Sequence, residues 1–473
     1  MNKIFYRSEE KSVCADVIPF FENGEFKLFY LKDYRDFEKY GEGCPWHLLT
    51  TSNFVDYKDH GPVLLRGSIN DQDLYVFTGS VFKKDDTYYI FYTGHNPHLV
   101  EKGMPQEKIL RAVSKDLLHW QKDNNFVLEA PEEFEKHDFR DPFVFYDEEK
   151  KKFGMLLAAR LNNNNPRLTK GVTLVAYSND LNKWAIQKTP FYAPNAYFTH
   201  ECPDLFKMGD YWYFLFSEFT DKISTTYRMS KSINGPWFAP EINTFDGHAF
   251  YAAKSYSDGK RRILFGWNPI KYEEKDFHTW QWGGNIIPHE IIQDKNGYLW
   301  VKCPDEIKNA FKEQINVVQT FSLGNCSGNP SQISTENDGQ HVVLFNEMPS
   351  ICQITFEFET TDNRGDFGCL LRCEENMNRF YKVKFEPRYH RFALDSSPRE
   401  NDNRFIQIDT ERPLEITPNV RHKVMIIAQE SVLEVYVDDK VAMSARMFDV
   451  SKGMFGLYSL NTKVHFFNVE IKK

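Results

Sequence analysis

Apolar and polar positions in the first part of the chain alternate in short runs, as in β-strands. Five stretches share one plan: an apolar strand with polar residues near its start, a turn rich in Gly, Asp or Lys, and an aromatic strand. The stretches are "DVIPFFENGEFKLFYL" from Asp16, "FTGSVFKKDDTYYIFYTG" from Phe77, "RDPFVFYDEEKKKFGMLLAAR" from Arg140, "ECPDLFKMGDYWYFLFSE" from Glu201 and "HAFYAAKSYSDGKRRILFGW" from His248. This self-similarity predicts one supersecondary unit repeated along the chain.

A second motif follows most of these hairpins: a strand that ends in Ser, a short polar turn and an aromatic residue. It occurs as "TTSNFVDY", "AVSKDLLHW", "AYSNDLNKW" and "SKSINGPW". A hairpin followed by a third and a fourth strand, repeated five times, predicts a five-bladed β-propeller over residues 1–304. The alternatives are a β-sandwich or several small β domains, which seldom repeat one motif in this way.

The pattern changes after residue 304. Residues 305–340 are expected to form a linker, with a short helix in "DEIKNAF" and a polar loop over Leu323 to Gln340. Short alternating strands resume over residues 341–473 with no helical pattern between them, which predicts a β-sandwich. The expected fold class is therefore all-β, a five-bladed β-propeller followed by a C-terminal β-sandwich.

Composition limits the partners. The net charge of −9, without any Lys/Arg-rich run, gives no general attraction to nucleic acid or to an anionic membrane. No apolar run approaches the roughly 20 residues that span a bilayer, and "MNKIFYRSEEKSV" lacks the apolar core of a secretory signal. We therefore expect a cytoplasmic monomer or homodimer with no nucleic-acid or membrane partner.

The eight cysteines are sparse and lack the paired spacing of a zinc site, so we expect reduced thiols, and neither a metal nor a cofactor.

Three acids open repeated strands. The first strand of a propeller blade lines the central channel, so we expect Asp16, Asp141 and Glu201 to occupy equivalent positions at one mouth of the ring. Glycoside hydrolysis needs two carboxyl groups beside the scissile bond, one acting as acid and the other as nucleophile or base. Taken singly, an Asp at a strand start is more typical of a turn, so the hypothesis rests on the set.

Several tryptophans are candidates for stacking against sugar rings, although such residues more often belong to the core. They are Trp212, Trp267, Trp280 and Trp282.

These motifs resemble glycoside hydrolase family 32, the fructan and sucrose hydrolases, over nearly the whole chain. The matching segments are "FRDPFVF", "HECPDLF", "FTGS", "FDGHAFYAAKSY", "RRILFGW" and "WQWGGNIIPHE", the last with His289 where the family has Arg. The resemblance implies Asp141 as the transition-state stabiliser and Glu201 as the acid/base. It also implies that carbohydrate is bound by Arg140, Phe77, Thr78, Ser80, His47, Trp46, Asp246, Tyr251, Trp267 and Trp282.

The chain departs from the family at the nucleophile segment. The family opens with Trp-Met-Asn-Asp-Pro-Asn-Gly, whereas this chain has "VCADVIPFFENGEFKLFYL". Alignment of "KLFY" with the family's Leu-Phe-Tyr places Asp16 on the nucleophile with a gap of one residue. The missing Trp and Asn residues contact the terminal fructose in the family, which puts strict fructofuranoside specificity in question.

The resemblance implies a β-fructofuranosidase-like glycosidase that cleaves a terminal fructofuranoside of sucrose, a fructo-oligosaccharide or a fructan. The expected mechanism is a retaining double displacement with Asp16 as nucleophile, which predicts a carboxyl separation of about 5–5.5 Å from Glu201. Two alternatives stay open: an inverting furanosidase of the arabinofuranosidase type, and a glycan-binding propeller without activity.

Overall fold

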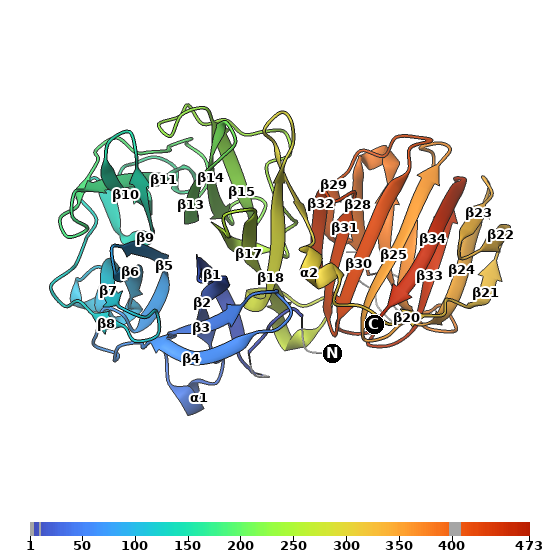
Figure 1. The fold of residues 1–473 in the computed structure, drawn as a ribbon, viewed down its shortest axis with the longest axis horizontal. Coiled ribbons are helices and arrows are strands. Elements are labelled where there is room, and N and C mark those ends of the chain that lie inside the picture. Colours follow the sequence, from blue (N-terminus) through green and yellow to red (C-terminus); the bar gives the residue numbers. More distant parts are fainter. Residues whose placement is uncertain (1–3, 9–10, 397–407) are drawn as a thin grey trace.

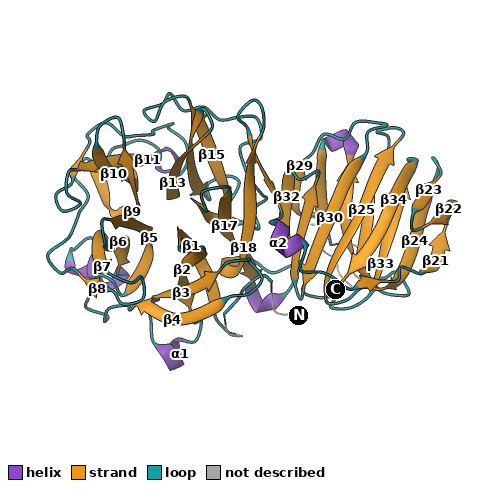
Figure 2. Cartoon of the chain, viewed as in Figure 1, coloured by secondary structure: helices purple, strands orange, loops and turns teal. Residues whose placement is uncertain are grey.

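The computed structural model describes residues 4–8, 11–396 and 408–473, and over these residues the chain is an all-β protein (Figures 1 and 2). The N-terminal strands form a ring of sheets, and the C-terminal strands form a two-layered sandwich beside it (Figure 1). Among the described residues, helix is limited to α1 (Phe37–Tyr40), α2 (Asp305–Lys308) and four 3-10 segments at Pro97–Lys102, Arg167–Thr169, Tyr272–Glu274 and Pro387–Tyr389. None of these helices has the length and apolarity that a membrane crossing requires.

Three sheets of the ring each come from one continuous segment. The first holds β5 (Tyr75–Lys84), β6 (Thr87–His95), β7 (Glu107–Ser114) and β8 (Gln121–Lys122). The second holds β9 (Phe134–Asp147), β10 (Lys152–Leu161), β11 (Gly171–Ser178) and β12 (Ala185–Ile186). The third holds β13 (Glu201–Met208), β14 (Tyr211–Glu218) and β15 (Ser224–Ser230). Each is antiparallel, with strands in sequence order.

The fourth sheet of the ring has eight strands and joins its two ends. It contains β1 (Val13–Glu22), β2 (Glu25–Asp33), β3 (Trp46–Thr51), β4 (Lys58–Leu64), β16 (Tyr251–Ser257), β17 (Arg262–Lys271), β18 (Trp280–Gln293) and β19 (Leu299–Lys302). The link between the early and late strands is the pairing of β1 with β18, where Cys14 lies opposite Gly284.

Turn residues that tolerate positive φ join the hairpins. Asn23 and Gly24, between β1 and β2, have φ of 54° and 80°, as a two-residue type I′ turn requires. Asp85 (φ 52°) begins the β5–β6 turn, and Gly209 (φ 57°) begins the β13–β14 turn. These are the Gly- and Asp-rich turns predicted from the sequence.

Five hydrogen bonds link β1, β5, β9, β13 and the β16–β17 hairpin in a closed cycle around the ring. They are Thr78 Oγ1 to Asp16 Oδ2 (2.5 Å), Val144 N to Ser80 Oγ (3.0 Å), Cys202 N to Asp141 Oδ2 (2.8 Å), Ser255 N to Asp204 Oδ2 (2.8 Å) and Trp267 Nε1 to Asp16 Oδ1 (2.9 Å). Because the acceptors are buried or nearly so, each contact satisfies a polar group that would be costly to leave unpaired.

The sandwich consists of two sheets around one apolar core. One sheet has the order β22 (Cys326–Asn329), β23 (Gln332–Thr335), β34 (Val464–Lys472), β25 (Ile351–Thr360), β30 (His422–Gln429), β31 (Val432–Val437) and β32 (Val441–Arg446), with β20 (Gln314–Ile315) paired to β34. The other has the order β21 (Gln319–Leu323), β24 (Gln340–Glu347), β33 (Met454–Leu460), β26 (Asp366–Cys373), β27 (Tyr381–Glu386), β28 (Arg391–Asp395) and β29 (Ile408–Pro413).

The segment 305–340 contains more strand than predicted, because β20 and β21 before the predicted loop also pair with sandwich strands. Its short helix is present as α2, but the predicted polar loop contains β22 and β23, which pair with each other, and β23 pairs with β34. β22 is the edge strand and is mostly exposed, so it buries too little apolar surface to leave a strand pattern in the sequence, whereas Ile333 and Thr335 of β23 are buried.

The ring and the sandwich share an apolar interface. Their apolar residues form one cluster that includes Ile291 and Val301 from the ring and Tyr436 from the sandwich. Arg446 is 1% exposed, and its guanidinium donates across the interface to the carbonyl oxygens of Asn268 (2.6 Å) and Pro269 (2.9 Å). Buried arginine donors matched to carbonyl acceptors fix the relative position of the two parts.

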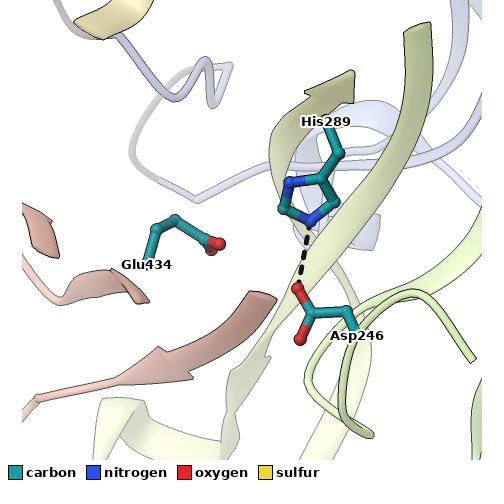
Figure 3. Close-up of side chains that lie close together, drawn as sticks. All are labelled: Asp246, His289 and Glu434. Carbon is teal, nitrogen blue, oxygen red and sulfur yellow. Dashed lines mark hydrogen bonds and ion pairs between the residues drawn. The ribbon is translucent and has the colours of Figure 1, made fainter. Parts of the chain in front are cut away.

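A second polar contact at this interface centres on Asp246 (Figure 3). Its carboxylate accepts hydrogen bonds from the Ser444 backbone (2.8 Å), the Ser444 hydroxyl (2.8 Å) and the Gly247 backbone (2.5 Å), and it pairs with His289 Nε2 at 3.0 Å. Asp246 and His289 belong to the ring, and Ser444 belongs to β32 of the sandwich.

Glu434 on β31 completes this cluster in its protonated form. Ser444 Oγ lies 2.8 Å from Asp246 Oδ2 and 3.0 Å from Glu434 Oε2, but a hydroxyl has one proton and donates to only one of them. The other contact needs a proton from a carboxyl group. Burial raises the pKa of Glu434 well above its ordinary value, so Glu434 donates to Ser444, which donates to Asp246.

Replacement of Asp246 by Ala is expected to destabilise the protein by about 3–5 kcal/mol, because the substitution leaves the buried partners of a charged group unpaired. Thermal unfolding measures the loss. The matched control is Asp210→Ala, since the side chain of Asp210 is 89% exposed and such changes cost about 0.5 kcal/mol or less. Equal melting temperatures for the two variants would contradict the assignment.

Candidate active site

A pocket of about 660 Å³ opens where the first strands of the ring converge. It is lined by the three acids predicted from the sequence, Asp16, Asp141 and Glu201. The other predicted residues that line it are Arg140, Phe77, Tyr251, Trp267, Trp280 and Trp282. The structure therefore gathers residues from β1, β5, β9, β13 and β16–β18 into one cavity.

β1, β5, β9, β13 and β16 each contain a β-bulge close to the pocket. The extra residue in each pairing begins at Asp16, Thr78, Asp141, Cys202 and Ala252. Four of these five, all except Thr78, have φ between 39° and 59°, a conformation uncommon outside Gly. Bulges re-aim side chains, and backbone outliers concentrate at functional sites.

The bulges correct one prediction. Asp16 and Asp141 do occupy equivalent positions, but Glu201 lies one residue before the bulge, in the position that Arg140 and Tyr251 hold on their own strands. The sequence motif aligned the strand starts, whereas the position of the bulge depends on hydrogen-bond register with the partner strand.

Asp16 is held from two sides. Thr78 Oγ1 donates to one carboxylate oxygen at 2.5 Å and Trp267 Nε1 donates to the other at 2.9 Å. Burial raises the pKa of Asp16 to about 6, opposed by these two hydrogen bonds. The carboxyl group is thus mostly ionised at neutral pH, with both oxygens fixed in direction.

Asp141 is the most enclosed of the three acids, at 4% exposure. Its backbone N–H donates to Thr93 Oγ1 (2.8 Å), and its carboxylate accepts from the backbone of Cys202 (2.8 Å). Burial raises its pKa to about 7, opposed by the positive charge of Arg140.

Glu201 is oriented by a cation and a phenol. Arg140 Nη2 donates to Oε1 at 3.1 Å, and the Tyr251 hydroxyl donates to Oε2 at 2.7 Å. Arg140 is in turn held by Asp138 (2.9 Å) and by Glu107 (3.3 Å). The surrounding carboxylates, Glu107 first, raise the pKa of Arg140 against the opposing effect of burial.

Aromatic side chains form the walls. Trp282 lies 6.3 Å from Phe77 and 6.5 Å from Trp267, measured between ring centroids. Phe219 and Ile223 also line the pocket and are 42% and 47% exposed. Ring faces beside fixed carboxylates suit a ligand with both C–H faces and hydroxyl groups.

Four predicted contact residues lie behind the pocket. Trp46 is fully buried and its indole donates to the carbonyl of Phe77 (3.2 Å), while His47 is buried and bonds Tyr34 (3.0 Å). Thr78 bonds Asp16, and Ser80 accepts from a backbone N–H of β9. The sequence motifs predicted that these four residues contact carbohydrate. Their side chains instead support the strands and Asp16 and do not line the cavity.

Two further predictions need correction. Asp246 does not line the pocket, because its carboxylate is hydrogen-bonded to Ser444 in the interface with the sandwich. Trp212 packs in a cluster between two sheets of the ring and does not line the pocket either. A buried Asp and a partly buried Trp have the same sequence signature whether or not a cavity is adjacent.

Several lining residues were missed. They are Gln106, Glu107, His137, Asp138, Cys202, Phe219, Ile223, His248, Ala252, Pro269 and Gln281. His137 and Asp138 directly precede the "RDP" motif, which is a signal that could have found them. Phe219 and Ile223 lie on a connection whose course is set by packing, so no periodic pattern marks them.

One group of described residues has the spacing of a metal site: Asp246, His289 and Glu434, whose ligand atoms all lie within 4.8 Å of one another. It lies outside the pocket. The hydrogen bonds to His289, Ser444 and Gly247 already account for the oxygens of Asp246.

Taken together, the ring of sheets and its pocket of fixed carboxylates and aromatic faces have the character of a carbohydrate-active site. Residues 18–304 match the family model for the glycosyl hydrolases family 32 N-terminal domain, and residues 297–471 match that for the "GH32, BT1760-like, C-terminal domain". The chain belongs to glycosyl hydrolase family 32. The first match begins two residues after Asp16, so Asp16 itself lies outside it.

About a quarter of the aligned residues are identical between this chain and its curated relatives. Levanase of Bacillus subtilis (strain 168) is 26% identical over 477 residues, covering 93% of this chain and 65% of that protein. Sucrose-6-phosphate hydrolase of Escherichia coli is 26% identical over 300 residues, covering 59% of this chain and 60% of that protein. The chain thus spans less than two thirds of the length of either relative.

Solved structures share the fold over the whole chain. The exo-inulinase from Aspergillus awamori has a TM-score of 0.74 at 19% identity, covering 100% of this chain and 98% of that chain. The sucrose-6-phosphate hydrolase from Lactobacillus gasseri has a TM-score of 0.73 at 17% identity, covering 100% and 92%.

Asp141→Asn is expected to stabilise the protein at pH 8 and to lose this advantage towards pH 5. The folded-state pKa of about 7 lies above the ordinary 3.8, so between these values the folded state binds more protons than the unfolded state. Stability therefore falls as pH rises, and Asn removes a cost on the order of 1–4 kcal/mol.

Melting temperatures of Asp141→Asn and the parent protein between pH 5 and 8 measure this effect. Asp210→Asn, at an exposed position, should show no such trend. A pH-independent difference between Asp141→Asn and the parent would contradict the argument.

Proposed function

We propose that this protein hydrolyses a terminal fructofuranoside of sucrose, a fructo-oligosaccharide or a fructan. The observation that carries the proposal is the convergence of Asp16, Asp141 and Glu201 in one pocket of a family 32 chain. Levanase and sucrose-6-phosphate hydrolase among the relatives support the substrate class.

Asp16 is the nucleophile in this proposal. Its carboxylate attacks the anomeric carbon while Glu201 donates a proton to the leaving oxygen, and a glycosyl ester with Asp16 results. Water then attacks the same carbon, Glu201 takes its proton, and the sugar leaves with Asp16 restored. The two hydrogen bonds to Asp16 favour its ionised form and limit its rotation.

Glu201 is supported as the acid/base by its two partners. The Tyr251 hydroxyl and the Arg140 guanidinium each bond one carboxyl oxygen and so define the plane of the group. Asp141, enclosed beside them, is proposed to bind ring hydroxyls, where a hydrogen bond strengthened in the transition state lowers the barrier.

We further propose that the ring has five blades and ends near residue 304. The eight-stranded sheet counts as two blades, β1–β4 and β16–β19, because its halves meet only through the β1–β18 pair. The five bulges and the five contacts between neighbours support this count. The boundary between the two family matches also falls near residue 304, and β20–β23 are assigned to the sandwich.

Asp16→Asn and Glu201→Gln are each expected to lower kcat by at least about 10³-fold, since each removes a group that forms or breaks bonds at the reacting centre. Sugar released from sucrose, inulin and levan, with an arabinofuranoside panel beside them, measures the loss. Asp210→Asn is the matched carboxylate control.

Release of arabinose alone would replace the fructoside assignment. Sugar binding without turnover in the parent protein would favour the glycan-binding alternative. A fully active Asp16→Asn variant would show that another group is the nucleophile.

The stereochemistry of the released sugar tests the double displacement. A retaining enzyme first releases the β-anomer of fructofuranose from sucrose, and with methanol present it forms methyl β-fructofuranoside, because two inversions restore the configuration. Rapid NMR spectra during turnover identify the first anomer. Initial release of the α-anomer would establish inversion instead.

A further inference from the structure

The charged groups of the pocket are almost all of one sign. Its lining includes the carboxyl groups of Asp16, Asp141, Glu201, Glu107 and Asp138, whereas Arg140 is the only Lys or Arg among the described residues that line it. An anionic ligand entering this space meets repulsion that low-dielectric walls strengthen.

Arg140 does not offset this charge for a ligand. Nη2 bonds Glu201, and Nη1 bonds Asp138 and Glu107, so both terminal nitrogens are engaged with carboxylates. The side chain is 11% exposed. A phosphate would have to displace one of these partners and leave its charge unpaired.

The two histidines of the lining add no permanent positive charge. Nδ1 of His137 accepts a hydrogen bond from the Gln106 backbone (3.2 Å), so this nitrogen has no proton to donate to a ligand. Burial lowers the pKa of His248 below its ordinary value. Neither ring supplies the positive charge that phosphate recognition normally uses.

A cation does lie close to the rim, but it is paired. Arg35 donates to the carbonyl of Trp282 and to Gln281 Oε1 (3.3 Å), and its Nε lies 2.8 Å from Asp33 Oδ2. Arg35 therefore holds the rim segment in place with its charge balanced.

Apart from the amides of Gln106 and Gln281, the remaining residues of the lining are apolar or aromatic. Trp282 is 36% exposed, and Phe219 and Ile223 are more exposed still. Exposed ring faces bind the C–H faces of uncharged sugars by dispersion and apolar contact.

We propose that this pocket takes unphosphorylated fructosides and discriminates against fructosides that carry a phosphate ester. This inference rests on the proposed function and separates the chain from those of its relatives that are named sucrose-6-phosphate hydrolases.

The test compares kcat/KM for sucrose and sucrose 6-phosphate with the intact protein. We expect at least tenfold lower kcat/KM for the phosphate ester. Added salt should narrow the gap, because screening weakens repulsion of the dianion and leaves the neutral sugar unaffected. Equal or faster hydrolysis of sucrose 6-phosphate would overturn the inference and leave the proposed function intact.

A substitution at the rim of the pocket tests whether charge causes the discrimination against the phosphate ester. Ile223→Lys places a cation at an exposed lining position and should raise the ratio of sucrose 6-phosphate to sucrose hydrolysis several-fold, while Ile223→Met should not. Equal ratios for the two variants would contradict charge as the determinant.

Failure of the proposed function would give a different result, namely no hydrolysis of either sugar. If neither sugar is hydrolysed, calorimetric titration of the parent protein with the same two sugars still decides the inference. Weaker binding of the phosphate ester would support it, and tighter binding would overturn it.

Discussion

The structure depends on placing carboxylates close together in a partly enclosed cavity while keeping them ionisable and fixed. Burial alone raises the pKa values of Asp16 and Asp141, and nearby like charge adds to the cost. Hydrogen-bond donors on the ring offset part of this cost, because they stabilise the ionised carboxylates and fix their direction. Asp16 receives hydrogen bonds from Thr78 and Trp267, and Asp141 receives one from the backbone of Cys202.

The same hydrogen bonds also join the ring. Five hydrogen bonds close the cycle around the ring. Asp16 or Asp141 is the acceptor in three of them, and Ser80 and Asp204 are the acceptors in the other two. The proposed catalytic acids are therefore part of the scaffold's own closure. This arrangement holds the side chains in the fixed positions that catalysis needs, and it couples the proposed catalytic charges to the stability of the ring.

The sandwich contributes to the site indirectly. Asp246 and His289 precede and follow the hairpin of β16 and β17, which carries Tyr251 and Trp267, and both are bonded to sandwich residues on β31 and β32. Because these hydrogen bonds are buried, they fix the hairpin relative to the sandwich. Asp246 therefore supports the pocket by anchoring the chain next to the β16–β17 hairpin, although its motif predicted contact with substrate.

The sequence by itself determined the all-β class, the hairpin turns and the acids that reach the pocket, because strand alternation, turn chemistry and repetition are local or periodic properties. Only the tertiary structure decided the register of the bulges, and with it the offset of Glu201. It alone also separated lining residues such as Phe77 from supporting ones such as Trp46. Those features depend on which strands pair and on what packs behind each side chain, and long-range pairing leaves no mark on the local pattern of a single sequence.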